Sequence, residues 1–310
     1  MLPTPSTSHV PYARVYEPAE DSFLLLDTLS SASETAFLAA RFPSSPSPPS
    51  SSPPPSSLSP SSQQPPDPGP RSAAAPLVLE VGPGSGVVLA FLTAHAQVLF
   101  SRRDILTLGI DVNRFACAAT SETVAKAVEE AEAEATAGEA GQQQQQQQQQ
   151  QAGAPGDGEA RRRPRPRTAG YHLGTAQGDL ATAVRPGAVD VLVFNPPYVP
   201  TPEVPPVRPQ STAVLPPQQQ QQEEDSRLLA LSYAGGRDGM EVTARLIGAL
   251  PEVLSPRGVA YLLLCAQNRP EEVKAGIRRL SGGPWRAETV GTSGRQAGWE
   301  KLQVVRIWRE

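Results

Sequence analysis

The chain has 310 residues, a formal net charge of −4 and two cysteines, Cys117 and Cys265. The charge argues against a general affinity for nucleic acid, and two isolated cysteines provide neither a disulfide framework nor a zinc site. No run of about 18 apolar residues occurs and the N-terminus lacks the apolar core of a secretory signal, so no membrane span is expected. We therefore expect a cytoplasmic protein, with the nucleus also open, that binds no metal.

Three segments are too polar and repetitive to pack into a core. They are rich in Ser and Pro, then in Ala, Glu and Gln, then in Pro and Gln, and they cover about 43–76, 129–170 and 201–225. Such segments bury too little apolar surface to offset the entropy of ordering, so we predict disordered inserts. Roughly 200 residues remain, which suits a single domain spanning 1–310.

Outside the inserts, short apolar strands alternate with amphipathic helices. Strands are predicted at the start of 77–86 and at 105–111, 189–194, 258–265 and 300–309. Helices are predicted at 87–96, 114–135, 241–254 and 271–280, after a helical N-terminal segment. The run at 189–194 is continuously apolar, as in parallel sheets covered on both faces. This alternation predicts an α/β fold with a doubly wound sheet.

Four unusual groups of residues follow the strands in order. "EVGPGSG" follows the first strand, Asp111 ends the second, "GDL" occupies 178–180, and "NPPY" ends the apolar run at 189–194. Each group alone could be a turn or a strand terminator. In doubly wound sheets, however, ligands bind at the carboxyl ends of the strands, so the ordered convergence predicts a nucleotide-like cofactor site.

The glycine loop indicates which cofactor this site would bind. Its spacing is not the Gly-x-Gly-x-x-Gly of dinucleotide sites, and Glu80 precedes it within the strand. A carboxylate there would repel a pyrophosphate but suits a cationic ligand such as S-adenosyl-L-methionine. The loop backbone is expected to lie against the amino-acid part of that cofactor, through Gly82, Gly84 and Gly86.

Three further residues are predicted to contact the nucleoside part of the cofactor. Asp111 would accept hydrogen bonds from the ribose hydroxyls, and Asp179 would accept one from the adenine amine. The Leu180 amide would contact a ring nitrogen. The alternative for Asp179 is a simple turn residue.

Five stretches together resemble the eukaryotic and archaeal branch of the HemK-like class I methyltransferases. They are "YEPAEDSFLLLDTL", "LEVGPGSGVVLAFL", "VDVLVFNPPYV", "YAGGRDGMEV" and "GRQAGWE". The resemblance implies the class I Rossmann-like fold, a mostly parallel sheet with an antiparallel closing strand. It also implies methylation of the glutamine N5 in the Gly-Gly-Gln motif of the class I translation release factor. A small zinc-binding activator subunit is implied as heterodimer partner.

The opening "YEPAED" narrows the match to this branch, in which it lies over the cofactor. Carried over to this chain, Tyr16, Glu20 and Ser22 would help close the site; Ser22 stands where the family often has threonine. Pro83 and Trp299 depart from the smaller or polar residues usual at their positions. These departures leave the expected chemistry unchanged.

The "NPPY" motif is predicted to hold a planar amide. The Asn195 side-chain oxygen and the Pro196 carbonyl could each accept one N–H of the substrate, and both favour positive charge developing on nitrogen. Pro196 and Pro197 would fix the backbone, while Tyr198 would supply an aromatic wall. Asn195 would also adjoin the cofactor.

Two alternatives remain open from the sequence. The same motif would accept the amine of a flipped adenine, as in a DNA or RNA adenine N6-methyltransferase. Against this, the sequence has neither a second DNA-reading domain nor an ordered basic face, so nucleic acid is not expected as the main substrate. A non-catalytic scaffold that has kept the fold is the other alternative.

Overall fold

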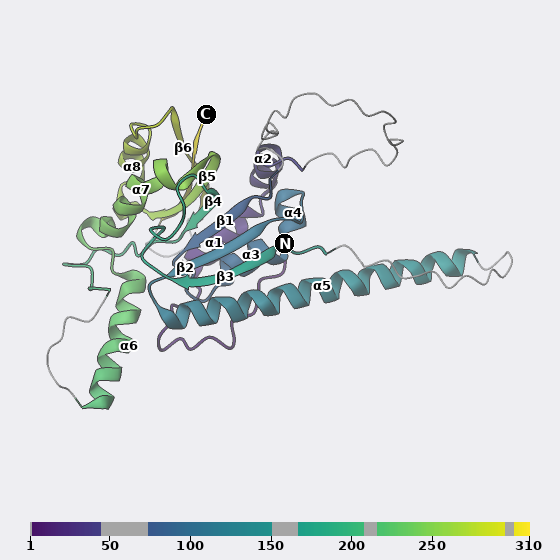
Figure 1. Cartoon of the computed structure of the whole chain (residues 1–310), viewed down its shortest axis with the longest axis horizontal. Coiled ribbons are helices and arrows are strands. Elements are labelled where there is room, and N and C mark those ends of the chain that lie inside the picture. Colours follow the sequence, from purple (N-terminus) through teal and green to yellow (C-terminus); the bar gives the residue numbers. More distant parts are fainter. Residues whose placement is uncertain (1, 45–73, 151–166, 208–215, 295–300) are drawn as a thin grey trace, which may run out of the picture.

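The computed structural model describes residues 2–44, 74–150, 167–207, 216–294 and 301–310 (Figure 1). Its described strands form one sheet in the order β3-β2-β1-β4-β5-β7-β6, in which β7 runs antiparallel to both neighbours and the other pairs are parallel. The predicted fold, a mostly parallel sheet with an antiparallel closing strand, is therefore confirmed. The strands are β1 (Leu77–Val81), β2 (Leu106–Asp111), β3 (Tyr171–Gln177), β4 (Val189–Phe194), β5 (Leu254–Cys265), β6 (Trp285–Thr292) and β7 (Leu302–Arg309).

Helices cover both faces of this sheet. Apolar side chains of α1, α2, α3 and α4 pack on one face, and those of α7 and α8 pack on the other. The helices are α1 (Glu20–Leu29), α2 (Ala32–Arg41), α3 (Val87–Ala94), α4 (Ala96–Phe100), α5 (Arg114–Gln150), α6 (Pro217–Tyr233), α7 (Glu241–Val253) and α8 (Pro270–Ile277). None of the helices in the described ranges is both long and apolar enough to cross a bilayer.

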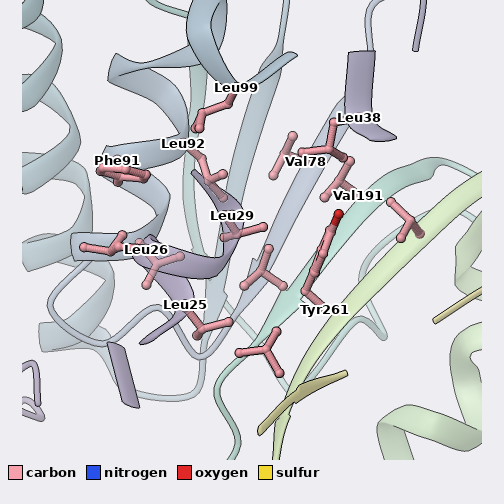
Figure 2. Close-up of a cluster of buried hydrophobic side chains, with 14 of the residues drawn as sticks. Leu25, Leu26, Leu29, Leu38, Val78, Phe91, Leu92, Leu99, Val191 and Tyr261 are labelled. Atoms are coloured by element: carbon pink, nitrogen blue, oxygen red, sulfur yellow. The ribbon is translucent and has the colours of Figure 1, made fainter. Parts of the chain in front are cut away.

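The first core lies between the N-terminal helices and the centre of the sheet (Figure 2). Leu25 and Leu29, one helical turn apart, place the apolar face of α1 against the sheet. They join Val78, Val191 and Tyr261, which come from β1, β4 and β5. Packing against these central strands fixes α1, whose first turn reaches the carboxyl ends of the strands.

Helix α2 is joined to the sheet by buried charges. Glu34 is 1% exposed and accepts hydrogen bonds from Arg306 Nη1 at 2.8 and 3.1 Å and from the Tyr261 hydroxyl at 2.8 Å. The Arg306 guanidinium lies 3.9 Å from the Phe37 ring centroid. These contacts satisfy a carboxylate that would otherwise be costly to bury.

Two of the predicted inserts contain helix. Helix α5 continues to Gln150, through residues predicted to be disordered from 129 onward, and α6 covers 217–225 of the third insert. Both begin or end against the folded body: Val124 of α5 packs beside Leu89 of α3, and Leu228 of α6 is buried. Anchored helices extend readily through Ala, Glu and Gln, which have high helix propensity.

Parts of several predicted features lie outside the described residues. These are 45–73 of the first predicted insert, 151–166 of the second, 208–215 of the third, and the motif positions 295–300 with Trp299. The predictions made for them remain predictions.

Candidate active site

The predicted site residues surround one cavity of about 180 Å³ at the carboxyl ends of β1, β2 and β4. The sheet brings them together because Val81 pairs with Ile110 on one side and with Phe194 on the other. The motifs that follow these strands are thus neighbours in space. The predicted residues that line the cavity are Tyr16, Ser22, Glu80, Gly82, Gly84, Asp111, Asp179, Leu180, Asn195, Pro196, Pro197 and Tyr198.

The glycine loop turns sharply between β1 and α3. Gly82, Gly84 and Gly86 have φ values of +63°, +56° and +81°, a region that favours glycine. Gly86 was predicted to contact the cofactor, but it does not line the cavity. A Cβ there would lie 2.6 Å from Thr120 Cα, so this glycine allows α3 to pack closely on α5. Gly82 and Gly84 are left to present backbone to a ligand.

Asp111 is fixed at the end of β2 by backbone donors. Its Oδ1 accepts from Asn113 N at 2.8 Å, and its Oδ2 accepts from Gly84 N at 3.2 Å. Burial raises the pKa of Asp111 to about 6, although these hydrogen bonds oppose the shift. The carboxylate therefore links the glycine loop to the strand beside it, where the sequence predicts a ribose contact.

Glu80 presents an oxygen to the cavity that has no partner. The side chain is 2% exposed, and Oε2 makes no hydrogen bond to any described residue. Burial raises the pKa of Glu80 to about 8, with a smaller contribution from the charge of Asp111. A buried acceptor without a donor is unfavourable, so this position favours a ligand that supplies an N–H or a positive charge.

Asn195 presents the second such oxygen. Its Oδ1 is buried and has no hydrogen-bond partner within the described parts of the chain. A substrate N–H would supply the missing bond. The cavity that Glu80 and Asn195 share also contains three other carboxylates and, as its one basic residue among those described, Arg245 at the rim. This set of hydrogen-bond acceptors fits S-adenosylmethionine, a cation without phosphate.

Glycines of the "YAGGRDG" stretch allow its backbone to lie close against the backbone of the "NPPY" motif. A Cβ at Gly235 would meet the Pro197 carbonyl at 2.4 Å, and one at Gly239 would meet the Tyr198 carbonyl at 2.0 Å.

Asn268 also fixes the backbone of this motif. Its Nδ2 donates to the Tyr198 carbonyl at 3.2 Å, while its Oδ1 accepts from Cys265 N at 2.9 Å. Sequence reasoning missed Asn268, whose only signal is its position just after β5.

Asp21, rather than the predicted Glu20, points into the site. Asp21 is 3% exposed and lines the cavity, whereas Glu20 is exposed and does not. Asp21 Oδ2 accepts from the Tyr16 hydroxyl at 3.1 Å and from the Tyr198 hydroxyl at 3.3 Å. Its Oδ1 accepts from Ser22 N at 2.6 Å. One carboxylate thus joins the tyrosine of the N-terminal opening to that of the "NPPY" motif.

At the other end of the cavity, Asp179 is already paired. Arg245 Nη2 of α7 donates to Asp179 Oδ2 at 2.5 Å, and both side chains are partly exposed. Leu180 follows with φ of +52°, which turns the chain over the cavity. The adenine amine predicted to bind Asp179 would share this carboxylate with Arg245.

Three known proteins are similar in sequence to this chain over nearly its whole length. Methyltransferase HEMK2 of Mus musculus is 30% identical, covering 99% of this chain and 96% of its own, and that of Homo sapiens is 28% identical, covering 98% and 95%. The eRF1 methyltransferase catalytic subunit mtq2 of Schizosaccharomyces pombe is 26% identical, covering 100% and 96%.

No family model matches the sequence. The mouse protein is nevertheless similar in sequence to this chain from end to end. A methyltransferase relative is what the fold and the residues around the cavity lead us to expect. This protein belongs to the HemK-like methyltransferase family that includes HEMK2.

Proposed function

We propose that this methyltransferase uses S-adenosylmethionine to methylate N5 of the glutamine in the Gly-Gly-Gln motif of the eukaryotic class I release factor. The observation that carries the proposal is the buried Asn195 Oδ1, which lacks a donor among the described residues and lies in the same cavity as Glu80. A primary amide supplies that donor. The name of the fission yeast relative, an eRF1 methyltransferase, supports the release factor as acceptor.

The cofactor would be held at the carboxyl ends of β1, β2 and β3. Glu80 and Asp111 would face its cationic and ribose parts, and Asp179 would face the adenine. When bound, S-adenosylmethionine supplies a methyl group on a positively charged sulfur. The acidic cavity favours this charge, whereas a phosphate-bearing cofactor would be repelled.

The acceptor amide is a poor nucleophile because its nitrogen lone pair is delocalised into the carbonyl. Asn195 Oδ1 and the Pro196 carbonyl would each accept one N–H and hold the nitrogen in line for transfer, which is mainly a positioning role. Both oxygens also stabilise positive charge developing on that nitrogen. Asp21 would keep Tyr198 against the flat side chain through its hydroxyl.

The resemblance to the HemK-like branch further implies a small zinc-binding activator as heterodimer partner. Strand β3 is a suitable binding site for this activator, because it is an edge strand among the described strands and carries the exposed side chains of Tyr171 and Leu173. A partner that binds there would shield the open edge of the sheet. Expressed alone the chain should be poorly soluble, and co-expression should rescue it. Full solubility and activity alone would contradict this part. A cytoplasmic location, with the nucleus also open, completes the proposal.

Two assays on the full chain, co-expressed with the activator, test the function. Calorimetry should detect S-adenosylmethionine binding, which a non-catalytic scaffold need not show. Labelled methyl should then pass to the release factor, and not to a release factor whose motif glutamine is replaced by alanine. Labelling of an adenine-containing oligonucleotide in preference to the release factor would instead support a nucleic-acid methyltransferase.

A further inference from the structure

Helix α6 and the segment before it form the wall of the cavity beside the "NPPY" motif. They follow that motif in the chain, and residues up to 225 belong to the stretch predicted to be a disordered insert. Figure 1 shows α6 next to the beginning of α5, with its N-terminal half directed away from the sheet. The residues of this wall that line the cavity are Val204, Val207, Leu228, Leu231, Ser232 and Tyr233.

One buried side chain and two ion pairs hold this wall in place. Leu228 is the only buried side chain of α6. Asp225 Oδ1 pairs with Arg14 Nε at 2.9 Å, and Glu224 Oε1 pairs with Arg114 Nη2 at 3.3 Å. Because Leu228 is the one buried side chain of α6, these two ion pairs contribute to the position of the helix over the cavity.

Arg14 connects the wall to the cofactor end of the site. Its carbonyl accepts from Asn113 Nδ2 at 2.7 Å, and its guanidinium lies 4.6 Å from the Phe115 ring centroid. Asn113 in turn donates its backbone N–H to Asp111 at 2.8 Å. Since Tyr16 is two residues further along and lines the cavity, the Arg14–Asp225 pair ties α6 to the segment that covers the cofactor.

The chemistry of the rim indicates what passes along it. Val207 and Tyr233 line the cavity yet remain 42% and 43% exposed, so they present apolar surface at its mouth. Glu224 and Asp225 of the same helix are already paired with arginines, so the rim carries no excess of positive charge with which to bind a phosphate backbone. The rim therefore fits an uncharged polypeptide segment better than a nucleic acid.

We propose that the polypeptide flanking the acceptor side chain docks along α6, and that the Arg14–Asp225 pair positions this helix to select the acceptor. The inference rests on the proposed function, because it concerns the protein that delivers the amide. It makes Arg14 and Asp225 positioning residues for acceptor binding, with no contact to the transferred methyl group.

A double-mutant cycle on the full chain with its activator tests this. Asp225→Asn and Arg14→Gln should each raise the KM for the release factor by roughly three- to five-fold, the scale of an exposed ion pair. The double variant should be no worse than either single variant, because both remove the same interaction. The kcat and the dissociation constant for S-adenosylhomocysteine should change by less than about two-fold.

Glu223→Gln is the matched control. It removes the same charge from the same helix, but Glu223 is exposed and forms no ion pair with any residue that the structure describes. Its KM should equal that of the wild type. High salt should raise the wild-type KM to the level of Asp225→Asn and leave that variant little changed.

Each outcome decides between the proposals. If Asp225→Asn behaves like Glu223→Gln, or if the two single effects simply add, the docking role of α6 is overturned while the proposed function stands. If the wild type transfers no methyl group to the release factor, both fall.

Discussion

At the residue scale, the protonation of Glu80 is set by its burial. A carboxyl group with a pKa of about 8 is mostly neutral near pH 7, whereas in the unfolded chain it would be ionised. Because the folded pKa is raised, Glu80 makes stability fall as pH rises between the unfolded value of 4.5 and about 8. A cationic ligand reverses this preference, because it favours the ionised form.

We therefore predict that cofactor binding near pH 7 releases a proton from Glu80. Calorimetry in buffers of different ionisation enthalpy should show a buffer-dependent heat for the wild type. Asp111, with a pKa of about 6, is mostly ionised at this pH and contributes less. Glu80→Gln should remove most of the buffer dependence. Equal heats in all buffers for the wild type would contradict the assignment of a cation to Glu80.

Asn195→Ala separates acceptor binding from cofactor binding. It removes one acceptor for the substrate amide, so methyl transfer should fall by roughly two to three orders of magnitude, as for one lost preorganised hydrogen bond. Affinity for S-adenosylmethionine should change only by severalfold.

Asp111→Ala is the complementary variant. It should weaken cofactor binding most and affect turnover at saturating cofactor less, since Asp111 lies at the predicted ribose contact. Thermal unfolding of both variants controls for misfolding. Normal turnover by Asn195→Ala would show that the prolines of "NPPY" merely end a strand.

The sequence contained enough information to select Asp21 instead of Glu20 as the residue that lines the cavity. The two carboxylates are adjacent, and family resemblance alone selected Glu20. Helical phase distinguishes them: Asp21 lies one turn before Leu25, which faces the core, so Asp21 faces inward as well. Asn268 had no comparable signal, because its contact with the Tyr198 carbonyl depends on tertiary packing.

At the element scale, the strands with the most buried side chains were the ones that the sequence predicted. The continuous apolar runs of β1, β4 and β5 were sufficient to predict strands in the sheet centre. Strands β3 and β6 were not predicted: β3 is an edge strand with exposed and polar positions, and β6 is the opposite edge. Helix α6 was missed because its glutamine-rich sequence lacks a wide apolar face, and its place depends on Arg14 and Arg114.

The docking of α2 gives a stability prediction at this scale. Glu34→Ala would leave the buried Tyr261 hydroxyl without its acceptor and remove the buried partner of Arg306, so the free energy of unfolding should fall by about 3–5 kcal/mol. Urea denaturation measures it. Glu288→Ala is the control, because Glu288 pairs with the same arginine at 3.3 Å but is 56% exposed; it should cost less than about 1 kcal/mol. Equal losses would contradict the role of burial.

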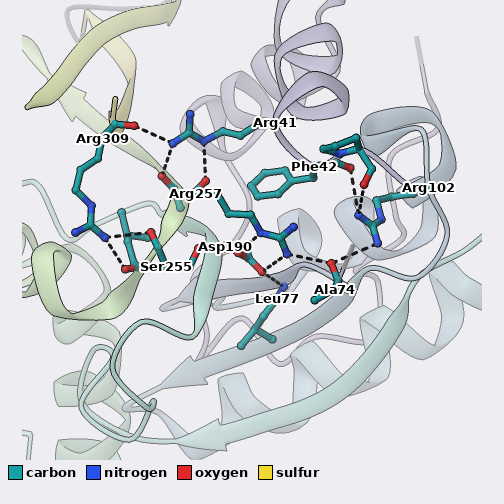
Figure 3. Close-up of polar contacts among 12 residues, drawn as sticks. Arg41, Phe42, Ala74, Leu77, Arg102, Asp190, Ser255, Arg257 and Arg309 are labelled. Carbon is teal, nitrogen blue, oxygen red and sulfur yellow. Dashed lines mark hydrogen bonds and ion pairs between the residues drawn. The ribbon is translucent and has the colours of Figure 1, made fainter. Parts of the chain in front are cut away.

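At the scale of the whole molecule, the Ser/Pro insert leaves the domain far from the site. Figure 3 shows Ala74, which precedes β1, between the side chains of Arg102 and Arg257. Arg102 donates to the Pro43 carbonyl at 3.1 Å and to the Ala74 carbonyl at 3.4 Å, and Arg257 donates to Ala74 at 3.0 Å. Because Ala74 precedes β1, this clamp lies at the amino ends of the strands, opposite the cavity.

Deleting 44–70 should therefore leave kcat and cofactor affinity within about two-fold of the wild type. The few residues left between Pro43 and Ala74 can span two carbonyls that bind one guanidinium. Loop entropy also changes only slowly with length, so stability should change little. Steady-state kinetics and thermal unfolding measure both. A large loss of turnover with folding preserved would show that the insert contributes to the site.

The most direct test of the proposed function is tandem mass spectrometry of the release factor after incubation with the full chain, its activator and S-adenosylmethionine. We expect one added methyl group on the side-chain amide of the Gly-Gly-Gln glutamine, formed roughly two to three orders of magnitude more slowly with Asn195→Ala. A release factor that stays unmodified under conditions in which the enzyme binds its cofactor, or a methyl group on another side chain, would contradict it.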